Sequence, residues 1–383
     1  MHRLQFHYTL SRHSSPAQVR NPLIDLLQAV SSHGSISAGA RALGLSYRHV
    51  WGELKRWEQE LGSELLIWEK GQSARLTEFG SKLMWAEAQA QARLAPQIEA
   101  LRSELERAFA VAFDPQAHVV TLYASHDHAL GALREFALAS DAVSAVHAQL
   151  HLDVRFSGSV DAIRALNEGR CVMAGFHTLQ DPVQGSVAQK IYKPLLKPGL
   201  HKIIGFASRT QGLMVAAGNP LGLRTLQDVQ HSAARFVNRA LGTGTRVVLD
   251  ELLAQSGLPA AQFPGYGHTE PSHTAVAHAI ASGAADVGLG IEVAARAHGL
   301  DFVPLLEENY HLVCLKSALE DPAIRALQDL LTSPAWQARL SALPGYRAWR
   351  SGEVQSLRRV LPWWDFASKR RAQHLVTKKR AAL

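Results

Sequence analysis

The sequence has little cysteine and no long hydrophobic run, and each shortage excludes a class of protein. Two cysteines, Cys171 and Cys314, are too few for a disulfide framework or a zinc site of four thiolates. The longest apolar stretches, such as residues 203–207, are far shorter than the roughly 20 residues that a membrane-spanning helix needs. The first residues lack the apolar segment of a secretory signal. We therefore expect a reduced, cytoplasmic protein that does not contact a membrane.

An excess of one charge is also missing from most of the chain. Residues 114–362 carry 21 Lys and Arg against 21 Asp and Glu, and residues 1–113 carry 13 against 11. Residues 363–383 carry 6 against 1, so most of the net charge of +7 lies in this last segment. A basic tail suits contact with nucleic acid and equally suits a solvated end of the chain. The hydrophobic content of 47% and the length of 383 residues predict two or three folded units.

A helix-turn-helix with a hairpin wing is predicted over residues 21–76, after an irregular extension of residues 1–20. Ser35 is placed to cap a second helix, and Ser46 opens a third after a glycine-bearing turn. The third helix keeps apolar residues on one side and polar ones on the other, as a helix that enters a DNA groove requires. Two short apolar runs within residues 65–76 predict the wing. The candidate DNA-binding residues are Ser35, Ser46, Tyr47, Arg48, His49, Lys55, Arg56 and Lys70.

A long helix is predicted from about residue 78 to residue 109, within a linker segment of residues 77–113. Its apolar residues recur at heptad-like intervals, and the stripe is too long for a small domain to bury alone. We therefore expect pairing with a second copy of the chain, as a homodimer or as a tetramer built from dimers.

Residues 114–362 change to short apolar strands alternating with amphipathic helices, which is the pattern of an α/β domain with a parallel sheet. Residues 203–207 and 212–216 are placed to cross into a second lobe, and residues 310–315 are placed to return to the first. Two lobes joined by two crossings predict a hinged cleft. The basic tail of residues 363–383 follows.

Three junctions between a strand and a helix carry small polar residues and glycines, which suit a small polar or anionic ligand. Backbone amides at helix starts and the hydroxyls beside them form anion-binding cradles. Neither a Walker A loop nor a dinucleotide fingerprint is present, and ordinary helix caps are the alternative interpretation. The candidate ligand-binding residues are Ser125, His126, Asp127, Ser157, Gly158, Ser159, His177, Asn238, Arg239, Gly242, Thr243, Gly244, Thr245, Arg246 and His273.

Signs of catalysis are missing from the same segments. No pair of histidines has the spacing of a helical zinc motif, and the Gly-x-Ser-x-Gly pattern of a serine nucleophile is absent. We therefore expect a protein that is not an enzyme and that holds no resident cofactor or metal. The alternative is an enzyme or a cofactor-delivery protein that acts on the ligand of the cleft.

Residues 22–112 resemble the N-terminal domain of ModE-type molybdate regulators and the related winged helix of LysR-type regulators. The resemblance lies in residues 34–51 (GSISAGARALGLSYRHVW) and residues 75–80 (RLTEFG). The Ser-Tyr-x-x-x-Trp start of the recognition helix favours the ModE type. No small molybdate-binding β-barrel follows the winged helix, which is a departure from full-length ModE.

Residues 118–355 resemble the periplasmic-binding-protein-like domain found behind such winged helices and attached to molybdenum-cofactor biosynthesis proteins. The matching stretches include residues 236–246 (FVNRALGTGTR) and 284–290 (AADVGLG). The resemblance implies an α+β winged helix-turn-helix with a long linker helix, followed by a two-lobed α/β domain of this type. It also implies a dimeric, one-component transcriptional regulator that binds double-stranded DNA and senses a small effector. The resemblance favours molybdate, tungstate or the molybdenum cofactor as that effector, and sulfate, a carboxylate or another small metabolite would equally suit the polar junctions.

Overall fold

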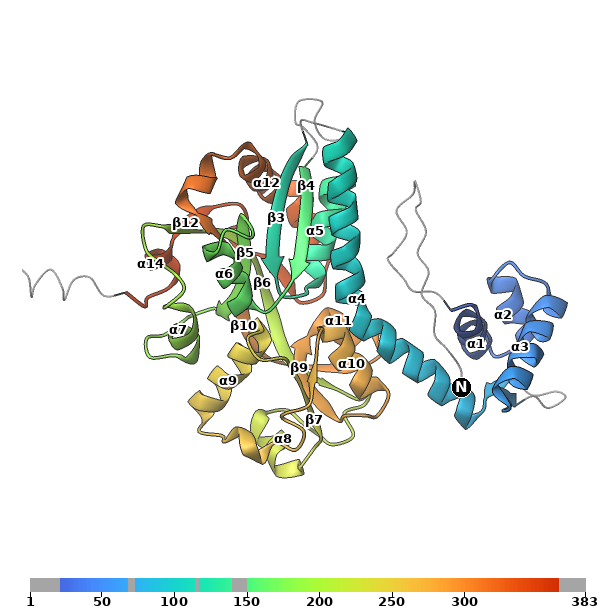
Figure 1. The fold of residues 1–383 in the computed structure, drawn as a ribbon. Coiled ribbons are helices and arrows are strands. Elements are labelled where there is room, and N and C mark those ends of the chain that lie inside the picture. The colour runs from blue at the N-terminus through green and yellow to red at the C-terminus, as the bar shows by residue number, and fades with distance from the viewer. Residues whose placement is uncertain (1–20, 68–72, 114–116, 140–149, 365–383) are drawn as a thin grey trace, which may run out of the picture. The chain divides into compact units, whose positions relative to one another are not determined.

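The computed structural model describes residues 21–67, 73–113, 117–139 and 150–364. The predicted N-terminal extension, the wing residue Lys70 and residues 365–383 of the predicted basic tail lie outside these ranges. The chain divides into two compact units, residues 1–99 and residues 100–383 (Figure 1).

The first unit consists of three short helices, a two-stranded hairpin and the start of a long helix. Its elements are α1 (Pro22–His33), α2 (Ile36–Ala42), α3 (Tyr47–Leu61), β1 (Leu66–Ile67), β2 (Arg75–Leu76) and α4 (Glu78–Phe113). The two strands pair antiparallel, with Leu66 opposite Leu76. The helix-turn-helix and the paired strands of the wing thus lie where the sequence predicts them.

Side-chain caps explain where the three short helices begin. Asn21 accepts a hydrogen bond from the amide of Leu23, Ser35 from that of Ala38, and Ser46 from that of His49. Each cap satisfies one of the amides that a helix start leaves without a partner. The core that holds the helices together is made of Leu23, Leu26, Leu27, Val30, Ile36, Val50, Leu54 and Leu65.

A glycine lets the first two helices approach closely. A Cβ atom at Gly39 would lie 3.0 Å from the backbone of Ala29 and Val30, so any side chain here would push α2 away from α1. Gly39 belongs to the helix-turn-helix motif, and its place there follows from packing.

The second unit contains a ten-stranded mixed sheet with helices on both faces. Its elements before the second crossing are β3 (His118–Ala124), α5 (His128–Ala139), β4 (Leu150–Phe156), α6 (Ser159–Asn167), β5 (Met173–Leu179), α7 (Val187–Tyr192), β6 (His201–Val215), α8 (Leu226–Ser232), β7 (Phe236–Arg239), α9 (Gly244–Ser256), η2 (Ala260–Gln262), β8 (Thr269–Glu270), α10 (His273–Ala281), β9 (Val287–Ile291) and α11 (Glu292–Ala297). The remaining elements are β10 (Asp301–Leu315), η3 (Lys316–Glu320), α12 (Pro322–Thr332), α13 (Pro334–Ser341), β11 (Tyr346–Ala348), β12 (Val354–Ser356) and α14 (Leu357–Val360).

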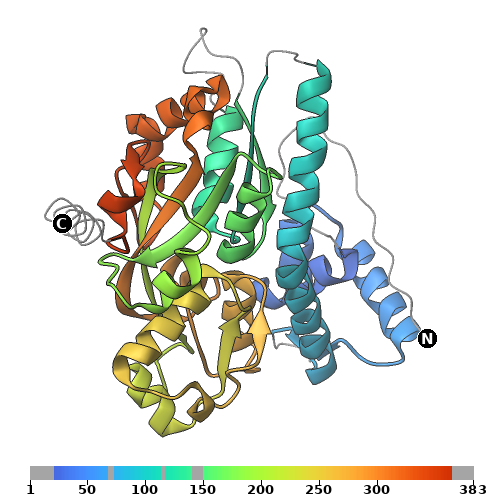
Figure 2. The ribbon, with the colours of Figure 1, turned by 60° about the vertical axis from the view of Figure 1, so that its left-hand side comes forward.

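Two long strands connect two lobes, as Figures 1 and 2 show. The strand order is β4-β3-β5-β10-β6-β9-β7-β8, with β11 and β12 also paired to β6. The first lobe holds β3, β4 and β5, the second holds β7, β8 and β9, and β6 and β10 run through both. One hydrophobic core includes buried residues of both lobes, such as Leu122 and Val276, and another is centred on Phe236, Leu249 and Leu289 of the second lobe.

The prediction of a parallel sheet is only partly right. Strands within each lobe are parallel, as in the pairs β3–β4 and β7–β9, whereas β10 lies antiparallel to both β5 and β6. The antiparallel pairs arise because the chain passes between the lobes once in each direction. The two predicted crossing segments, residues 203–207 and 212–216, belong to the single strand β6.

The second half of α4 packs on the sheet of the second unit. The hydroxyl of Ser103 donates to the carbonyl oxygen of Leu152 (3.0 Å) and accepts from the amide of Val154 (2.9 Å). Both are backbone groups of the edge strand β4, which would otherwise need another partner. An ion pair between Glu106 and Arg134 of α5 (3.4 Å) adds a further contact. The end of the long helix is therefore fixed to the first lobe.

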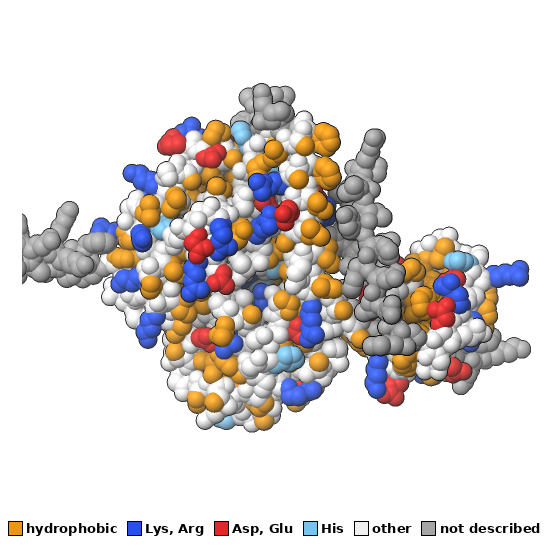
Figure 3. Space-filling view, in the orientation of Figure 1, with side chains coloured by type: hydrophobic (Ala, Val, Ile, Leu, Met, Phe, Trp, Pro, Cys, Tyr) orange, Lys and Arg blue, Asp and Glu red, His pale blue; other side chains and the backbone are white. Residues whose placement is uncertain are grey.

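Charge on the larger unit is mixed. On the face drawn in Figure 3, basic and acidic side chains lie interspersed over the lobes. This matches the equal numbers of basic and acidic residues between residues 114 and 362. Non-specific attraction of a polyanion to this face is therefore not expected.

Candidate functional site

The two lobes contact each other at the predicted polar junctions. The amide of Val160, at the start of α6, donates to the carbonyl oxygen of Gly242 in the second lobe (3.2 Å). A Cβ atom at Gly158 would lie 2.9 Å from the same oxygen. Glycine at position 158 therefore allows the two backbones to meet, and the cleft is closed at this point.

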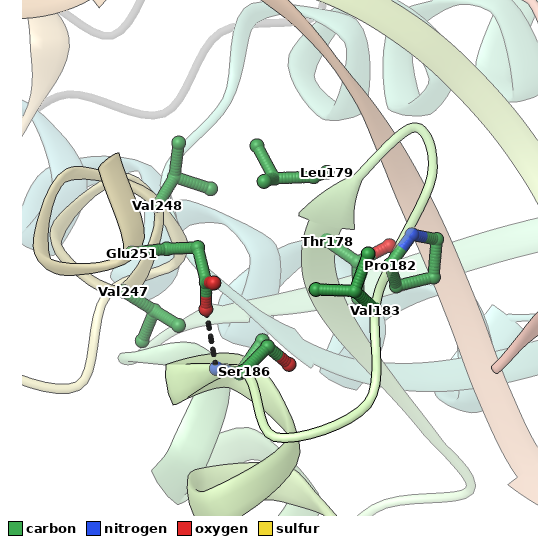
Figure 4. A pocket seen from close by; sticks show the side chains of 9 residues that line it. Thr178, Leu179, Pro182, Val183, Ser186, Val247, Val248 and Glu251 are labelled. Atoms are coloured by element: carbon green, nitrogen blue, oxygen red, sulfur yellow. Dashed lines mark hydrogen bonds between the residues drawn. The ribbon is translucent and has the colours of Figure 1, made fainter. Parts of the chain in front are cut away.

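A second contact between the lobes is made by Glu251 of α9. Its carboxylate accepts hydrogen bonds from the amides of Val187 (2.5 Å) and Ala188 (3.3 Å), at the start of α7 in the first lobe. Figure 4 shows this carboxylate pointing at the start of α7 beside a small cavity. The glutamate satisfies helix-start amides across the cleft, so it favours the closed arrangement.

Beneath these contacts lies a buried group of polar side chains, which we call the cleft cluster: Asp127, His177, Arg209, Gln211, Arg239, Thr245, His273, Glu308 and Tyr310. Its centre is Arg209 of β6, whose guanidinium donates to the carboxylates of Asp127 and Glu308. Burial alone would lower the pKa of Arg209, but the two carboxylates raise it well above its ordinary value. Arg209 is therefore a cation held between two carboxyl groups, of which burial raises the pKa of Glu308.

Asp127 is occupied by the protein itself. One of its oxygens accepts from the amide of Ala129 (2.8 Å) and so caps α5. The other accepts from Arg209 and from the hydroxyl of Tyr346 (2.7 Å). Asp127 therefore positions the cluster and is not an open group for a ligand.

Arg239, at the end of β7, is the second buried cation and has a different environment. Its side chain is 2% exposed, and one terminal nitrogen donates to the carbonyl oxygen of Pro271 (2.9 Å). Among the described residues, its Nε and Nη1 atoms have no hydrogen-bond partner and no carboxylate pairs with it. Burial, and then the charge of Arg209, lowers the pKa of Arg239 to about 9, so the group is still cationic at neutral pH. A buried charge that pairs with no carboxylate is destabilising.

Two buried imidazoles lie close to this cation. The ring of His177 stacks on Tyr310 with 3.9 Å between the centroids, and neither of its nitrogens has a partner among the described residues. The Nε2 atom of His273 lies 3.2 Å from the hydroxyl of Thr245. Burial, followed by neighbouring cations, lowers the pKa of both histidines well below the ordinary value. Both rings are thus neutral, and each can donate one hydrogen bond to a ligand.

Glycine at position 244 brings the start of α9 against the cluster. A Cβ atom there would lie 2.4 Å from Nδ1 of His177. Any side chain at this position would displace the imidazole, so the glycine of the predicted cradle has a steric reason to be there.

The predicted ligand residues are all buried or half-buried, and three of their side chains make local contacts. Ser125 and Ser159 face each other across 3.4 Å in the first lobe, and His126 lies edge-on to Phe156. The other buried or half-buried residues of the prediction are Ser125, His126, Asp127, Ser157, Gly158, Ser159, His177, Arg239, Gly242, Gly244, Thr245 and His273.

The side chains of Asn238, Thr243 and Arg246 make local contacts instead. The Nδ2 atom of Asn238 donates to Tyr266, and the hydroxyl of Thr243 donates to the carbonyl oxygen of Ala240. Arg246 pairs with Asp250 (3.0 Å) and lies over the ring of Tyr266. These contacts hold the loop and α9, and the role of the three residues in binding a ligand stays a prediction.

Residues of the crossing strands were missed by the sequence analysis. Arg209 and Gln211 come from β6, and Glu308 and Tyr310 come from β10. The expectation considered only junctions between strands and helices. The available signal was a charged side chain inside each of two long strands, at Arg209 and at Glu308, since such residues are buried only when they are paired.

The candidate DNA-binding residues lie on an exposed face of α3. Tyr47, Arg48, His49, Lys55 and Arg56 are exposed. Ser35 and Ser46 use their hydroxyls as helix caps, and Lys55 and Arg56 pair within the helix with Glu58 and Glu53, both at 2.7 Å. Arg48 makes no ion pair within the described ranges, so it is the most available cation of the helix.

The described ranges contain neither a cluster of metal-ligating side chains nor a helix that could span a membrane. No three His, Cys, Asp or Glu side chains gather as metal ligands do in residues 21–67, 73–113, 117–139 and 150–364. Over the same residues, no helix has the length and hydropathy to span a membrane.

Two protein families match successive parts of the chain. Residues 23–81 match the bacterial regulatory helix-turn-helix proteins of the lysR family. Residues 140–332, about half of the chain, match the PBP superfamily domain. The ModE-like features of the recognition helix stay a prediction from the sequence.

Individual relatives share parts of this arrangement. The chain is 33% identical over 200 residues to the uncharacterized protein YvgK of Bacillus subtilis, a match that covers 52% of this chain and 64% of that protein. It is 32% identical over 109 residues to an uncharacterized Clostridium pasteurianum protein from the 5′ region of a ferredoxin gene, covering 28% of this chain and 96% of that protein. Among solved structures, OxyR from Corynebacterium glutamicum has 16% identity and a TM-score of 0.41, covering 85% of this chain and 97% of that one. The chain thus spans less than two thirds of the length of YvgK.

Proposed function

Since the chain belongs to the PBP superfamily and carries a helix-turn-helix of the lysR family of bacterial regulators, we propose that it is a one-component regulator controlled by a small anion in its cleft. It is a DNA-binding transcriptional regulator of the LysR type with an effector-binding domain. Proteins of this type are regulators and not enzymes. We propose the chemical class of the effector, the residues that bind it and the dimeric assembly.

The observation that carries the proposal is the environment of Arg239. This buried guanidinium has two nitrogens without a partner among the described residues, and two neutral imidazoles lie close by. A small anion would neutralise the cation, accept from the free N–H groups and contact the amides at the start of α9. The same geometry disfavours a cation or a purely apolar ligand.

A tetrahedral oxyanion of molybdenum or tungsten, or the molybdenum cofactor, is our first candidate for the effector. This choice rests on the resemblance of residues 118–355 to domains attached to molybdenum-cofactor biosynthesis proteins. Sulfate and small carboxylates offer the same charge and hydrogen-bond acceptors, so they are the second candidates.

Calorimetric titration with molybdate, tungstate, sulfate and formate tests this part of the proposal. We expect at least one of them to bind the wild type, and Arg239→Gln to weaken binding about tenfold or more, because a charge-assisted contact is lost. Arg246→Gln is the matched control, since that arginine belongs to the same loop and helix but pairs with Asp250. If Arg239→Gln binds as tightly as wild type, the proposed site is wrong.

DNA is the proposed second partner, bound by a dimer. Tyr47, Arg48, His49 and the polar flank of α3 through Lys55 would enter the major groove, and the wing near Lys70 would contact backbone phosphate. Pairing through the apolar positions of α4 would place two such heads on one duplex.

The proposed switch is a change in lobe closure. An anion that binds both lobes stabilises the closed cleft, because its affinity differs between the closed and open arrangements. The second half of α4 is fixed to the first lobe through Ser103, so movement between lobes would reach the helix that leads to the DNA-binding unit.

A further inference from the structure

A second cavity lies on the opposite face of the crossing strands. It has a volume of about 450 Å³ and is lined by eleven residues, of which Asn309, Trp349, Arg350, Arg358, Arg359 and Pro362 matter most here. We call it the arginine groove. Its size is within the range of sites that hold small organic molecules.

Strand geometry separates the groove from the cleft. Neighbouring residues of a strand point to opposite faces, and residues paired across strands point to the same face. Tyr310 pairs with His177 on the cleft side, whereas Asn309 pairs with Thr178 on the other side. Glu308 and Tyr310 therefore face the cleft cluster, while Asn309 between them faces the groove.

The turn that carries Arg350 is held firmly on β6. The amide of Gly205 donates to the carbonyl oxygen of Glu353 (3.0 Å), and the amide of Gly352 donates to that of Gly205 (2.9 Å). A Cβ atom at Gly205 would lie 2.1 Å from the carbonyl oxygen of Arg350, so only glycine fits.

Arg350 also has a strained backbone. Its φ angle is 46°, in the left-handed region that a long side chain rarely adopts. Such strain tends to occur at binding sites. The fixed turn keeps the arginine in this conformation at the groove.

The lining of the groove combines three kinds of recognition. Arg350, Arg358 and Arg359 line the groove together with one acidic residue, Asp181, so basic lining residues outnumber acidic ones. The half-buried ring of Trp349 and apolar neighbours such as Pro362 provide a surface for a ring. Asn309 is 3% exposed, and its Oδ1 atom has no partner among the described residues, so it can accept a hydrogen bond.

We propose that the arginine groove is a second ligand site, which takes a small organic dianion in which a phosphate ester is joined to a ring. The guanidinium groups bind the phosphate oxygens, because their planar forks match that geometry. The ring packs on Trp349 and Pro362, and a donor on the ligand reaches Asn309.

Occupancy of the groove reaches the cleft through β10. Asn309 lies between Glu308 and Tyr310 on this strand, and the pairing of β10 with β6 is irregular between Tyr310 and His311. A ligand that orders Asn309 and the turn at Arg350 changes the affinity of the cleft for its anion, and the anion changes the affinity of the groove by the same factor.

Calorimetric titration of the full chain with phenyl phosphate, inorganic phosphate and phenol tests the proposal. We expect phenyl phosphate to bind more tightly than either of the other two, since it alone has both the anion and the ring. Arg350→Gln and Arg359→Gln are each expected to weaken it about tenfold or more. Arg224→Gln, an exposed arginine of the second lobe that does not line the groove, is the control.

Each other outcome overturns the proposal. If phenyl phosphate does not bind at about 10 mM, the proposed site is wrong, because functional ligand sites have dissociation constants below that concentration. If both groove variants bind phenyl phosphate as tightly as wild type does, phenyl phosphate binds at another site. If inorganic phosphate binds as tightly as phenyl phosphate, the ring does not contribute to binding. Arg239→Gln separates this site from the cleft: phenyl phosphate should still bind that variant with no more than the coupled change, even if no anion binds the cleft.

Discussion

Arg239 combines deep burial with a charge that no described carboxylate neutralises. Such a residue lowers the stability of the protein without ligand and raises it when an anion is bound, which is common for binding sites. Arg209, by contrast, has Asp127 and Glu308 beside it and is part of the structure itself. Two arginines of one cluster thus have opposite roles, and their partners decide which is which.

Replacing Arg239 with methionine is expected to stabilise the anion-free protein. The variant Arg239→Met keeps similar bulk and removes the uncompensated charge, so we expect a gain of about 1–4 kcal/mol in the free energy of unfolding. Urea unfolding without added anion measures this, and an anion that stabilises the wild type should leave the variant unchanged. A variant less stable than wild type would mean that Arg239 already has a counter-charge.

The buried histidines are expected to lower the free energy of unfolding in acid. Burial lowers the pKa of His311 to about 3, and burial with nearby cations lowers those of His177 and His273 well below 6.5. The unfolded chain, whose histidines titrate near 6.5, therefore binds more protons below that pH. Stability is complete above about pH 6.5 and falls as the pH drops below it, by up to about 1.4 kcal/mol per pH unit for each histidine.

Urea unfolding at pH 7.5 and pH 5.5 measures this fall. The variant His177→Gln should lose less stability than wild type over the same interval, since one depressed pKa is removed. His33→Gln is the control, because this histidine is exposed on α1. Identical pH profiles for wild type and His177→Gln would contradict the assignment of a neutral, buried imidazole.

The sequence could not distinguish Arg239 from Arg246. Both lie in one glycine-rich segment, and either guanidinium could have pointed into the cleft. Their directions depend on groups far along the chain: the carbonyl of Pro271 for Arg239, and the ring of Tyr266 beside Asp250 for Arg246. Such tertiary contacts leave no local pattern, whereas the glycines and hydroxyls of the segment do.

At the scale of elements, the basic side chains of the recognition helix α3 differ in whether they form an ion pair. Lys55 and Arg56 have glutamate partners one turn away, whereas Arg48 has no ion pair among the described residues. A cation already paired on a helix gains less from a phosphate or a base edge, because it must leave its partner.

Arg48→Ala is therefore expected to weaken binding to DNA more than Lys55→Ala. A base contact by arginine is worth about 1–3 kcal/mol, which is about fivefold to 150-fold in affinity. Gel-shift titration and footprinting on the promoter region of the chain's own gene measure the effect, with Arg224→Gln as a control. A footprint that survives Arg48→Ala unchanged would show that another surface enters the groove.

Helix starts were the most predictable elements, and the crossing strands the least. Ser35 and Ser46 cap their helices as expected because a cap is a local interaction. Strand β6 looked like two short strands because the polar run from Ser208 to Gln211 interrupts its apolar residues. That run is polar because it lines the cleft, so the feature that concealed the strand is part of the site.

At the scale of the whole molecule, two lobes meet around the cleft cluster and share a hydrophobic core. Glu251 with the start of α7, and Gly242 with the start of α6, hold the closed arrangement in which the cleft cluster is buried. The order of strands and helices along the chain was sufficient to predict the two lobes and the winged helix, because both follow from alternation and spacing. The closed state itself depends on contacts between distant residues.

The link between cleft and DNA is tested most directly by measuring DNA affinity with and without anion. The ligand is whichever of molybdate, tungstate, sulfate and formate binds the wild type most tightly, and the DNA is the promoter region of the chain's own gene. We predict that saturating anion changes the affinity of the wild type for DNA severalfold, and that it has no effect on Arg239→Gln, which should still bind DNA. An anion that binds the cleft but leaves the affinity of the wild type for DNA unchanged would contradict the proposed coupling.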